Sequence, residues 1–239
     1  MNTVVVLQPQ FFPWVGVFEQ IRLADVYVHL DDVDFPQGRS FTSRVQIKTP
    51  AGSQWLTAPV VRASGQLIRD TRLDAAQPWR AKHLRTLQTS YSRAPFADEM
   101  LELVAELYAL PTDSLCELNV AAIERIAAYF DFPCRFLRSS GRPTTSKSSQ
   151  RLIDIVAAEE GDTYITGHGA LGYLDYDAFE AAGIRVEYID YRRQPYPQLH
   201  GGFDPHVSIL DLIANVGRAG QKFICSTGVY WKEFVRRAA

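Results

Sequence analysis

The sequence predicts an α/β fold with a mainly parallel sheet of the Rossmann-like or nucleotidyltransferase-like type, together with a helical insertion. Two observations support this prediction. Short apolar runs rich in β-branched residues alternate with helical patterns towards both ends of the chain, which is typical of a parallel sheet covered by helices. The first strand, helix and second strand also fit within residues 3–32, and the crossover rule then makes the two strands parallel.

The opening unit places polar residues at the ends of two strands. An apolar strand over residues 4–7 ends at Gln8, and after a helix a second strand over residues 26–30 ends on the pair Asp31 and Asp32. Ligands of parallel sheets bind beyond the carboxyl ends of the strands. We therefore expect Gln8 and either Asp31 or Asp32 to open into one cleft, because adjacent strand residues point to opposite faces.

The middle of the chain predicts short strands followed by helices. We expect strands over residues 45–47 and 55–60, the second of them as a third strand of the sheet, and an edge strand within residues 66–77. Helical periodicity punctuated by prolines predicts helices over residues 79–92, 95–109 and 112–130. Residues 78–130 would then form a helical insertion or subdomain on the sheet.

The alternation of strands and helices returns in the C-terminal part. We expect strands over residues 134–137, 163–165 and 184–188, and helices over residues 150–159, 175–182 and 208–216. A short amphipathic tail follows. The whole chain, residues 1–239, is predicted to be one domain with the insertion at about residues 78–130.

The composition excludes several classes of protein. A hydrophobic fraction of 46% in 239 residues is ample for a sizeable core, and a net charge of −2 does not favour nucleic acid or an anionic membrane as partner. The three cysteines show no CxxC spacing, so neither a disulfide framework nor a zinc site is expected. Because the apolar runs are too short for a signal peptide or a membrane span, we expect a cytoplasmic protein that binds a small molecule.

Two candidate sites follow the first two strands. Gln8, Trp14 and Gly16 stand at the turn before the first helix, where free N–H groups would face an anion; the alternative is a tight turn with a packed indole. Asp31 and Asp32 could bind a divalent metal, an amine or a ribose, and the alternative is a solvated turn. No histidine pattern has metal-ligand spacing, so we expect no structural metal.

Two further candidates lie nearer the C-terminus. Ser146 and Lys147 precede a helix and could hold a phosphate, unless they form only a surface loop with an N-cap serine. Gly167 would let the backbone approach a ligand closely, His168 could act as an acid or base, and Tyr173 follows nearby.

Asp211 has two possible roles. It stands in the first turn of a predicted helix, where the helix dipole favours a carboxylate. Alternatively, it reaches across to Arg44 or Lys48 and fixes that basic segment over the site.

Over nearly its whole length the chain resembles the WbqC-like family. The opening QPQFFPWVGVFEQIRLADVYVHLDDVDF carries the family pattern, and SILDL, which begins at Ser208, matches a second motif. Further matches are Arg44 with the following IKT, Trp55 with LT, and YPQ from Tyr196. Two positions differ: Leu7 replaces the usual histidine, and Ser43 stands where asparagine is common.

This resemblance implies an enzyme of polysaccharide or specialised-metabolite biosynthesis. It would form an amide between a small acyl group or amino acid, such as glycine, and an amine on an amino sugar nucleotide or related metabolite. The activated acyl donor would come from ATP or a thioester. The alternative is a non-catalytic protein that binds a sugar nucleotide or another metabolite.

The expected amide-forming reaction suggests roles for the candidate residues. Asp31 or Asp32 would hold the ammonium or a metal, and Arg44 and Lys48 would hold a carboxylate or phosphate. The acyl or phosphate pocket would be lined by Gln8 and Gly16 on one side and by Tyr164, Gly167 and Tyr173 on the other.

The chain is also similar, at the level of fold, to nucleotidyltransferases that begin with a HIGH motif, such as pantothenate synthetase and class I aminoacyl-tRNA synthetases. Residues 146–149, SKSS, occupy roughly the place of their second, Ser- and Lys-rich loop. The histidines of the first motif are absent, and Trp14 and Phe18 lie in their neighbourhood instead. ATP is therefore a possible cofactor by analogy only.

Overall fold

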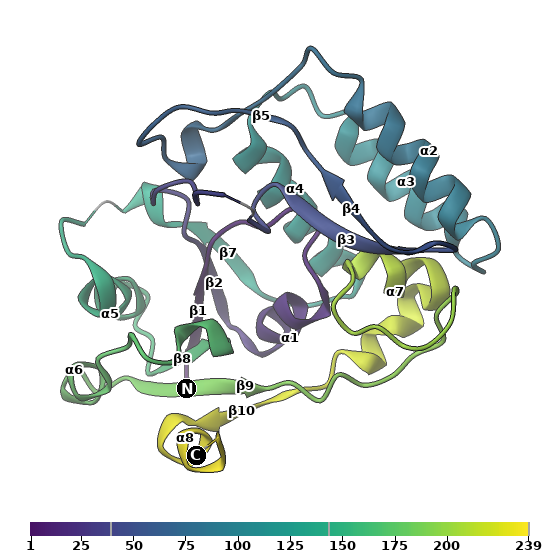
Figure 1. Ribbon diagram of the computed structural model, residues 1–239. Helices are drawn as coiled ribbons and strands as arrows, with labels where there is room; N and C mark the ends of the chain where they lie inside the picture. Colours follow the sequence, from purple (N-terminus) through teal and green to yellow (C-terminus); the bar gives the residue numbers. More distant parts are fainter. Residues whose placement is uncertain (39, 143, 239) are drawn as a thin grey trace.

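A computed structural model describes residues 1–38, 40–142 and 144–238 and centres on one six-stranded sheet (Figure 1). The strand order is β10-β9-β8-β1-β2-β7. These strands are β1 (Thr3–Leu7), β2 (Val26–His29), β7 (Arg135–Arg138), β8 (Thr163–Thr166), β9 (Arg185–Asp190) and β10 (Thr227–Tyr230). Neighbours are parallel except β9 and β10, which are antiparallel. The predicted α/β class with a mainly parallel sheet is confirmed, as is the parallel pairing of β1 with β2.

The strand order reverses between β1 and β8. From β1 the chain moves outwards to β2 and then to β7, after which it crosses back to place β8 on the other side of β1. In open α/β sheets such a switch point leaves a crevice at the carboxyl ends of the two strands. The fold therefore provides a crevice directly after Leu7 and Thr166.

Helices cover both faces of the sheet, because successive strand residues point to opposite sides. Val5 and Tyr27 share one apolar core with residues of α1 and α4, whereas Val4 and Val6 share a second core with residues of α5 and α6. These helices are α1 (Val15–Leu23), α4 (Leu115–Tyr129), α5 (Ser148–Ala158) and α6 (Tyr176–Ala181).

The predicted helical stretch is present as α2 (Trp79–Tyr91), α3 (Ala97–Tyr108) and α4. Its third helix begins as expected, because the Ser114 hydroxyl accepts a hydrogen bond from the Glu117 amide at 3.2 Å. Met100 of α3 and Ile123 of α4 belong to the same apolar core as Val5 of the sheet. The helices are therefore joined to the sheet by a continuous core.

The strand predicted near Trp55 does not join the central sheet. It is β4 (Gly52–Thr57), which pairs antiparallel with β3 (Arg44–Thr49) as a separate hairpin beside α2 and α7 (Figure 1). Only two residues separate the strands, and Gly52 has a φ of +104°. So short a turn favours pairing of β4 with β3, and this hairpin is a separate two-stranded sheet, so the expectation of a third sheet strand is wrong.

The remaining elements are short. β5 (Val60–Val61) and β6 (Arg72–Leu73) form a second small hairpin, and α7 (Ile209–Val216) and α8 (Trp231–Ala238) lie near the C-terminus. The described residues also form the 3₁₀ helices η1 (Ile68–Asp70), η2 (Ser139–Gly141), η3 (His168–Ala170) and η4 (Gly217–Phe223). Within the described ranges, every helix is too short or too polar to cross a membrane.

Candidate functional site

A cavity of about 300 Å³ lies at the switch point, at the carboxyl ends of β1 and β8. Its polar lining consists of Gln8, Gln10, Tyr164, Thr166 and Tyr173, together with the backbone of Gly167. We call it the switch-point cavity. It brings together four of the predicted site residues: Gln8, Tyr164, Gly167 and Tyr173.

The two glutamines are the polar groups best placed to meet a ligand. Both side chains are half-buried, and neither amide hydrogen-bonds to another protein group in the part of the chain that the structure describes. Each amide offers a carbonyl acceptor and an NH₂ donor. Groups that are partly withdrawn from water and lack protein partners gain most from a ligand that pairs with them.

The other walls combine apolar contact with one exposed tyrosine. Leu30, after β2, and Leu152, on α5, contribute aliphatic surface that the sequence did not identify as part of a site. Tyr164 is only 1% exposed and stacks on Phe179, with ring centroids 5.3 Å apart, so it belongs to the apolar core and forms one wall of the cavity. Tyr173, in contrast, is 58% exposed and stands at the rim.

Gly167 has a packing reason to be glycine. A Cβ atom there would lie 2.9 Å from the hydroxyl of Tyr191, which in turn accepts a hydrogen bond from Gln20 at 3.1 Å. The backbone at the end of β8 can therefore approach these side chains only without a side chain of its own.

His168 does not line the switch-point cavity. The 3₁₀ turn η3 directs its ring towards Tyr191 and Phe234, with ring centroids 4.9 and 4.8 Å away, and its Nε2 donates to the carbonyl of Ile189 at 2.8 Å. The predicted acid or base is thus engaged on the other side of Gly167, and a role for His168 at this cavity is not supported.

Asp31 and Asp32 lie at the expected edge of the sheet but are occupied by protein groups. Asp31 is 1% exposed and accepts hydrogen bonds from Ser139 Oγ at 3.2 Å and from the Ser140 amide and hydroxyl at 2.9 and 2.7 Å. Asp32 accepts from Ser139 and pairs with Arg151.

Neither aspartate is among the residues that line the switch-point cavity. Their oxygens already pair with hydroxyl, amide and guanidinium donors, so the pair does not fit a divalent cation. No group of three or more histidine, cysteine or acidic residues suited to a metal occurs in residues 1–38, 40–142 and 144–238. The solvated-turn alternative does not hold either, because Asp31 is buried.

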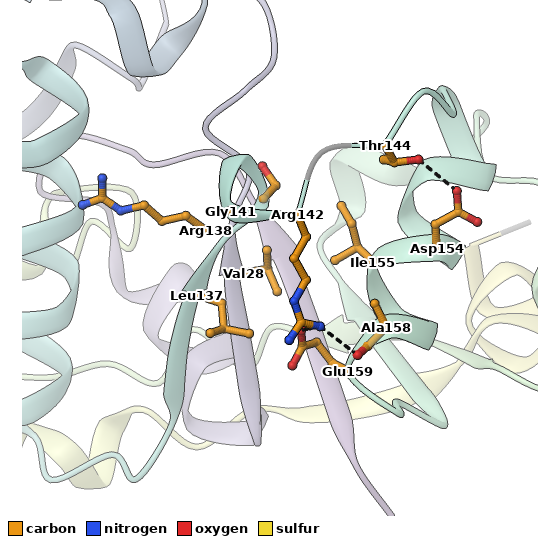
Figure 2. Close-up of a pocket in the computed structure, with 11 residues that line it drawn as sticks. Val28, Leu137, Arg138, Gly141, Arg142, Thr144, Asp154, Ile155, Ala158 and Glu159 are labelled. Atoms are coloured by element: carbon orange, nitrogen blue, oxygen red, sulfur yellow. Dashed lines mark hydrogen bonds and ion pairs between the residues drawn. The ribbon is translucent and has the colours of Figure 1, made fainter.

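The loop with Ser146 and Lys147 is tied to the helix that follows it. Lys147 is the N-cap residue of α5 and is exposed. The Ser146 amide donates to Thr144 Oγ1 at 3.2 Å, and Thr144 donates to Asp154 on α5 at the same distance (Figure 2). Hydrogen bonds from Ser146 and Gln150 lower the pKa of Asp154. An anion bound here would meet the charge of Asp154, which weakens the predicted phosphate site.

Trp14 and Gly16 form a packed turn. The Trp14 ring lies over Gly16, where a Cβ atom would come within 2.2 Å of it, and contacts the rings of Tyr191 and His206. The structure therefore favours the interpretation as a tight turn with a packed indole.

Arg44, Lys48 and Asp211 do not form the predicted direct contact. The Arg44 guanidinium lies 3.8 Å from the centroid of the Trp55 ring. Lys48 is 6% exposed and donates to the Gln198 side chain at 3.1 Å and to the Gly202 carbonyl at 2.6 Å. It thereby anchors the segment that precedes α7 to the hairpin.

Asp211 is fully buried on α7 and accepts hydrogen bonds from Tyr91 at 2.9 Å and Tyr196 at 3.0 Å. Burial raises the pKa of Asp211, while the two tyrosines and the nearby charge of Lys48 oppose that rise. The predicted position in the first turn of the helix is confirmed, whereas the predicted direct contact with Arg44 or Lys48 is wrong, because the two tyrosines occupy the carboxylate.

A second cavity, of about 440 Å³, lies between β7 and α5 (Figure 2). Leu137 and Ile155 line it, and Arg142 reaches across it to pair with Glu159 and to donate to the Ala158 carbonyl at 2.9 Å. Glu159 also pairs with Arg135 at 2.7 Å. Glu159 is therefore held between two guanidinium groups, Asp154 accepts hydrogen bonds from Thr144 and Gln150, and none of the predicted functional residues lines this cavity.

Comparison with known proteins identifies the family. A model of the WbqC-like protein family matches residues 8–223. The curated protein named uncharacterized protein Rv1507c, from Mycobacterium tuberculosis (strain ATCC 25618 / H37Rv), is 32% identical over 229 residues, which cover 94% of this chain and 98% of that protein. No solved structure is significantly similar to the chain. The family match extends over most of the residues, from Gln8, directly after β1, through β8 and beyond, and the chain belongs to the WbqC-like protein family.

Proposed function

We propose that the chain is a transferase or ligase that forms an amide between a small acyl group and an amine of a metabolite bound in the switch-point cavity. The metabolite would be an amino sugar nucleotide or a related compound. The observation that carries this proposal is the pair of half-buried amides, Gln8 and Gln10, without protein partners among the described residues at the switch point. Such amides suit the hydroxyl and amide groups of a sugar derivative.

The absence of formal charge in this lining also favours amine chemistry. None of the residues that line the described cavity is acidic or basic, so an ammonium group would lose water without gaining a counter-charge. Desolvation of this kind lowers the pKa of an amine and favours its neutral, nucleophilic form. The amine nitrogen would bond to the acyl carbon, the activating phosphate or thiol would leave with its electron pair, and the nitrogen would lose one proton to water.

The proposal is tested by supplying both substrates. The protein is incubated with glycine, ATP and UDP-glucosamine, which carries a free amine, and mass spectrometry follows the gain of one glycyl group. Glycyl thioester replaces glycine and ATP in a parallel reaction. We expect Gln8→Ala and Gln10→Ala to lower kcat/KM about tenfold or more, which corresponds to ~1.4 kcal/mol of transition-state stabilisation.

Gln88→Ala is the matched control, because Gln88 is an exposed glutamine on α2 that does not line the cavity. Absence of product with either acyl donor would contradict the proposed reaction. If UDP-glucosamine nevertheless raises the melting temperature and Gln8→Ala abolishes that rise, the alternative of a non-catalytic binding protein is supported. Ligand at 100 times its Kd stabilises a protein by about 2.7 kcal/mol, so binding would be readily detected.

A further inference from the structure

We propose that a third cavity, between β4 and α2, is a second ligand site that binds a ring-shaped ligand carrying an anionic group. This cavity has a volume of about 560 Å³ and is lined by Trp55, Trp79, Lys82, His83 and the glutamines 54 and 77, among others. We call it the β4–α2 cavity. It shares no lining residue with the switch-point cavity, so the inference goes beyond the proposed function and does not depend on it.

The anionic group follows from the cations around this cavity. Lys82 is exposed at its edge, and within the described ranges its ammonium forms neither an ion pair nor a hydrogen bond. Arg44 lies on the ring of Trp55 and likewise has no carboxylate partner among the residues that the structure describes. Arg44 is not among the residues that line the cavity, so Lys82 is the cation on its wall, and a cation without a protein counter-charge favours an anion as partner.

The ring follows from the aromatic wall. Trp55 and Trp79 both line the β4–α2 cavity. Trp79 is 4% exposed, with the Arg80 guanidinium 4.6 Å from its ring centroid, whereas Trp55 is partly exposed and Arg44 lies over one face of its ring, so Trp55 is the indole that a ligand can meet. An indole offers a broad apolar face on which a flat ligand ring can pack with little loss of conformational freedom. The exposed amide of Gln54 supplies a donor and an acceptor for polar groups on that ring, and Gln77, whose Nε2 donates to Asp74 at 3.4 Å, adds its carbonyl oxygen as an acceptor.

His83 does not supply the charge. Its Nδ1 lies 3.0 Å from the hydroxyl of Tyr108, and its ring also bonds to the backbone of Thr57. Burial lowers the pKa of His83 to about 4, so the ring is neutral at pH 7. Lys82 is therefore the cation that the wall of this cavity offers to a ligand, and its removal is the sharpest test.

Isothermal titration calorimetry at pH 7 and low salt tests the site with four probes. Uridine 5′-monophosphate and glucose 1-phosphate each combine a ring with a phosphate, uridine provides a ring alone, and inorganic phosphate provides the anion alone. We expect at least one of the two ring phosphates to bind tenfold or more tightly than uridine and inorganic phosphate. Whichever of them binds identifies a nucleotide or a sugar phosphate as the source of this chemistry.

Variants then locate the binding. Lys82→Ala and Trp55→Ala are each expected to weaken binding of the ring phosphate at least tenfold. Lys82→Arg, which keeps the positive charge, should retain binding. Arg85→Ala is the matched control, because it removes a cation from an exposed position on the same helix that does not line the cavity. Gln8→Ala should leave this binding unchanged, which separates the two cavities.

Three outcomes would overturn the proposal. The first is that neither ring phosphate binds at millimolar concentration. The second is that inorganic phosphate binds as tightly as they do, which would mean that the site selects no ring. The third is an equal effect of Lys82→Ala and Arg85→Ala, with circular dichroism showing both variants folded.

Discussion

Replacement of Asp211 by alanine should destabilise the fold far more than a helix-start role allows. The carboxylate is fully buried and accepts hydrogen bonds from Tyr91 and Tyr196 at 2.9 and 3.0 Å. A hydrogen bond to a charged group contributes about 1.5–3 kcal/mol, and a buried donor left without an acceptor costs about 1–3 kcal/mol. Relief of the buried charge offsets part of this, so we expect a loss of about 2–4 kcal/mol.

Urea unfolding at pH 7, followed by circular dichroism and extrapolated linearly to water, measures this loss. Asp211→Asn keeps the shape and one oxygen, and it should cost less than Asp211→Ala. A double-mutant cycle with Tyr91→Phe should give a coupling energy of about 1 kcal/mol or more. A loss below about 1 kcal/mol for Asp211→Ala would refute this reasoning, because that is the value expected of helix-dipole stabilisation alone.

The pH dependence provides an independent check on Asp211. Burial raises the pKa of the folded carboxyl above its unfolded value, so folding favours the protonated form. The stability that this group contributes is therefore present below an unfolded pKa of about 3.9 and is lost as the pH rises through the folded pKa. The free energy of unfolding of the wild-type protein should exceed that of Asp211→Asn by more at pH 4 than at pH 7.

Three further changes have defined outcomes. Gly16→Ala should lower the melting temperature, at a cost of about 1–3 kcal/mol, because its Cβ would come within 2.2 Å of the Trp14 ring. A double-mutant cycle on the largely buried pair Asp32 and Arg151, measured by urea unfolding, should give a coupling energy of more than about 1 kcal/mol. The exposed pair Arg72 and Asp113 should give a smaller coupling energy, and equal values for the two pairs would contradict the role of burial. Burial lowers the pKa of His83 in the folded protein to about 4. The neutral ring therefore stabilises the fold above about pH 6.5, and up to ~3 kcal/mol of that stability is lost as the pH falls towards 4. The unfolding free energy of His83→Gln should change less between about pH 7 and 4.5 than that of the wild-type protein.

Sequence patterns were sufficient for elements with strong periodicity. The helices α2, α3 and α4 begin and end within a few residues of their predicted bounds because prolines and an N-cap serine mark them. Alternation does not show which strand is the neighbour, so β4 was assigned to the wrong sheet. The strand β10 was missed because it is short, includes Gly228 and lies at the sheet edge.

Which residues line the switch-point cavity was predictable where the end of a single strand decides their position. Gln8 and Gly167 directly follow β1 and β8, and both line the switch-point cavity. Asp31 also follows a strand, but the residues that occupy its carboxylate, Ser139 and Ser140, are more than a hundred positions away. Sequence spacing carries no information on such partners, so a buried carboxylate and a free one look alike before the fold is known.

The position of the two cavity glutamines depends on the residues between and after them. In an extended backbone alternate side chains point to opposite sides. Gln8 and Gln10 line the cavity, whereas Pro9 is buried and Phe11 is 1% exposed. Asn119 on α4 donates to the Pro9 carbonyl at 3.2 Å, and the Phe11 amide donates to a carbonyl at residue 41 at 2.9 Å.

These bonds fix the backbone on both sides of Gln10 before any ligand arrives. A ligand that pairs with the amides of Gln8 and Gln10 then has to order only side-chain torsions, at about 0.5–1.5 kcal/mol for each immobilised side chain. The larger cost of fixing a backbone, about 1–2 kcal/mol for each residue, is met when the chain folds. Preorganisation of this kind distinguishes the end of β1 from the loop at Ser146 and Lys147, whose polar groups hydrogen-bond locally to one another and to their own helix. Anchoring of the backbone therefore supports the proposed ligand binding at the switch-point cavity as much as the chemistry of its lining does.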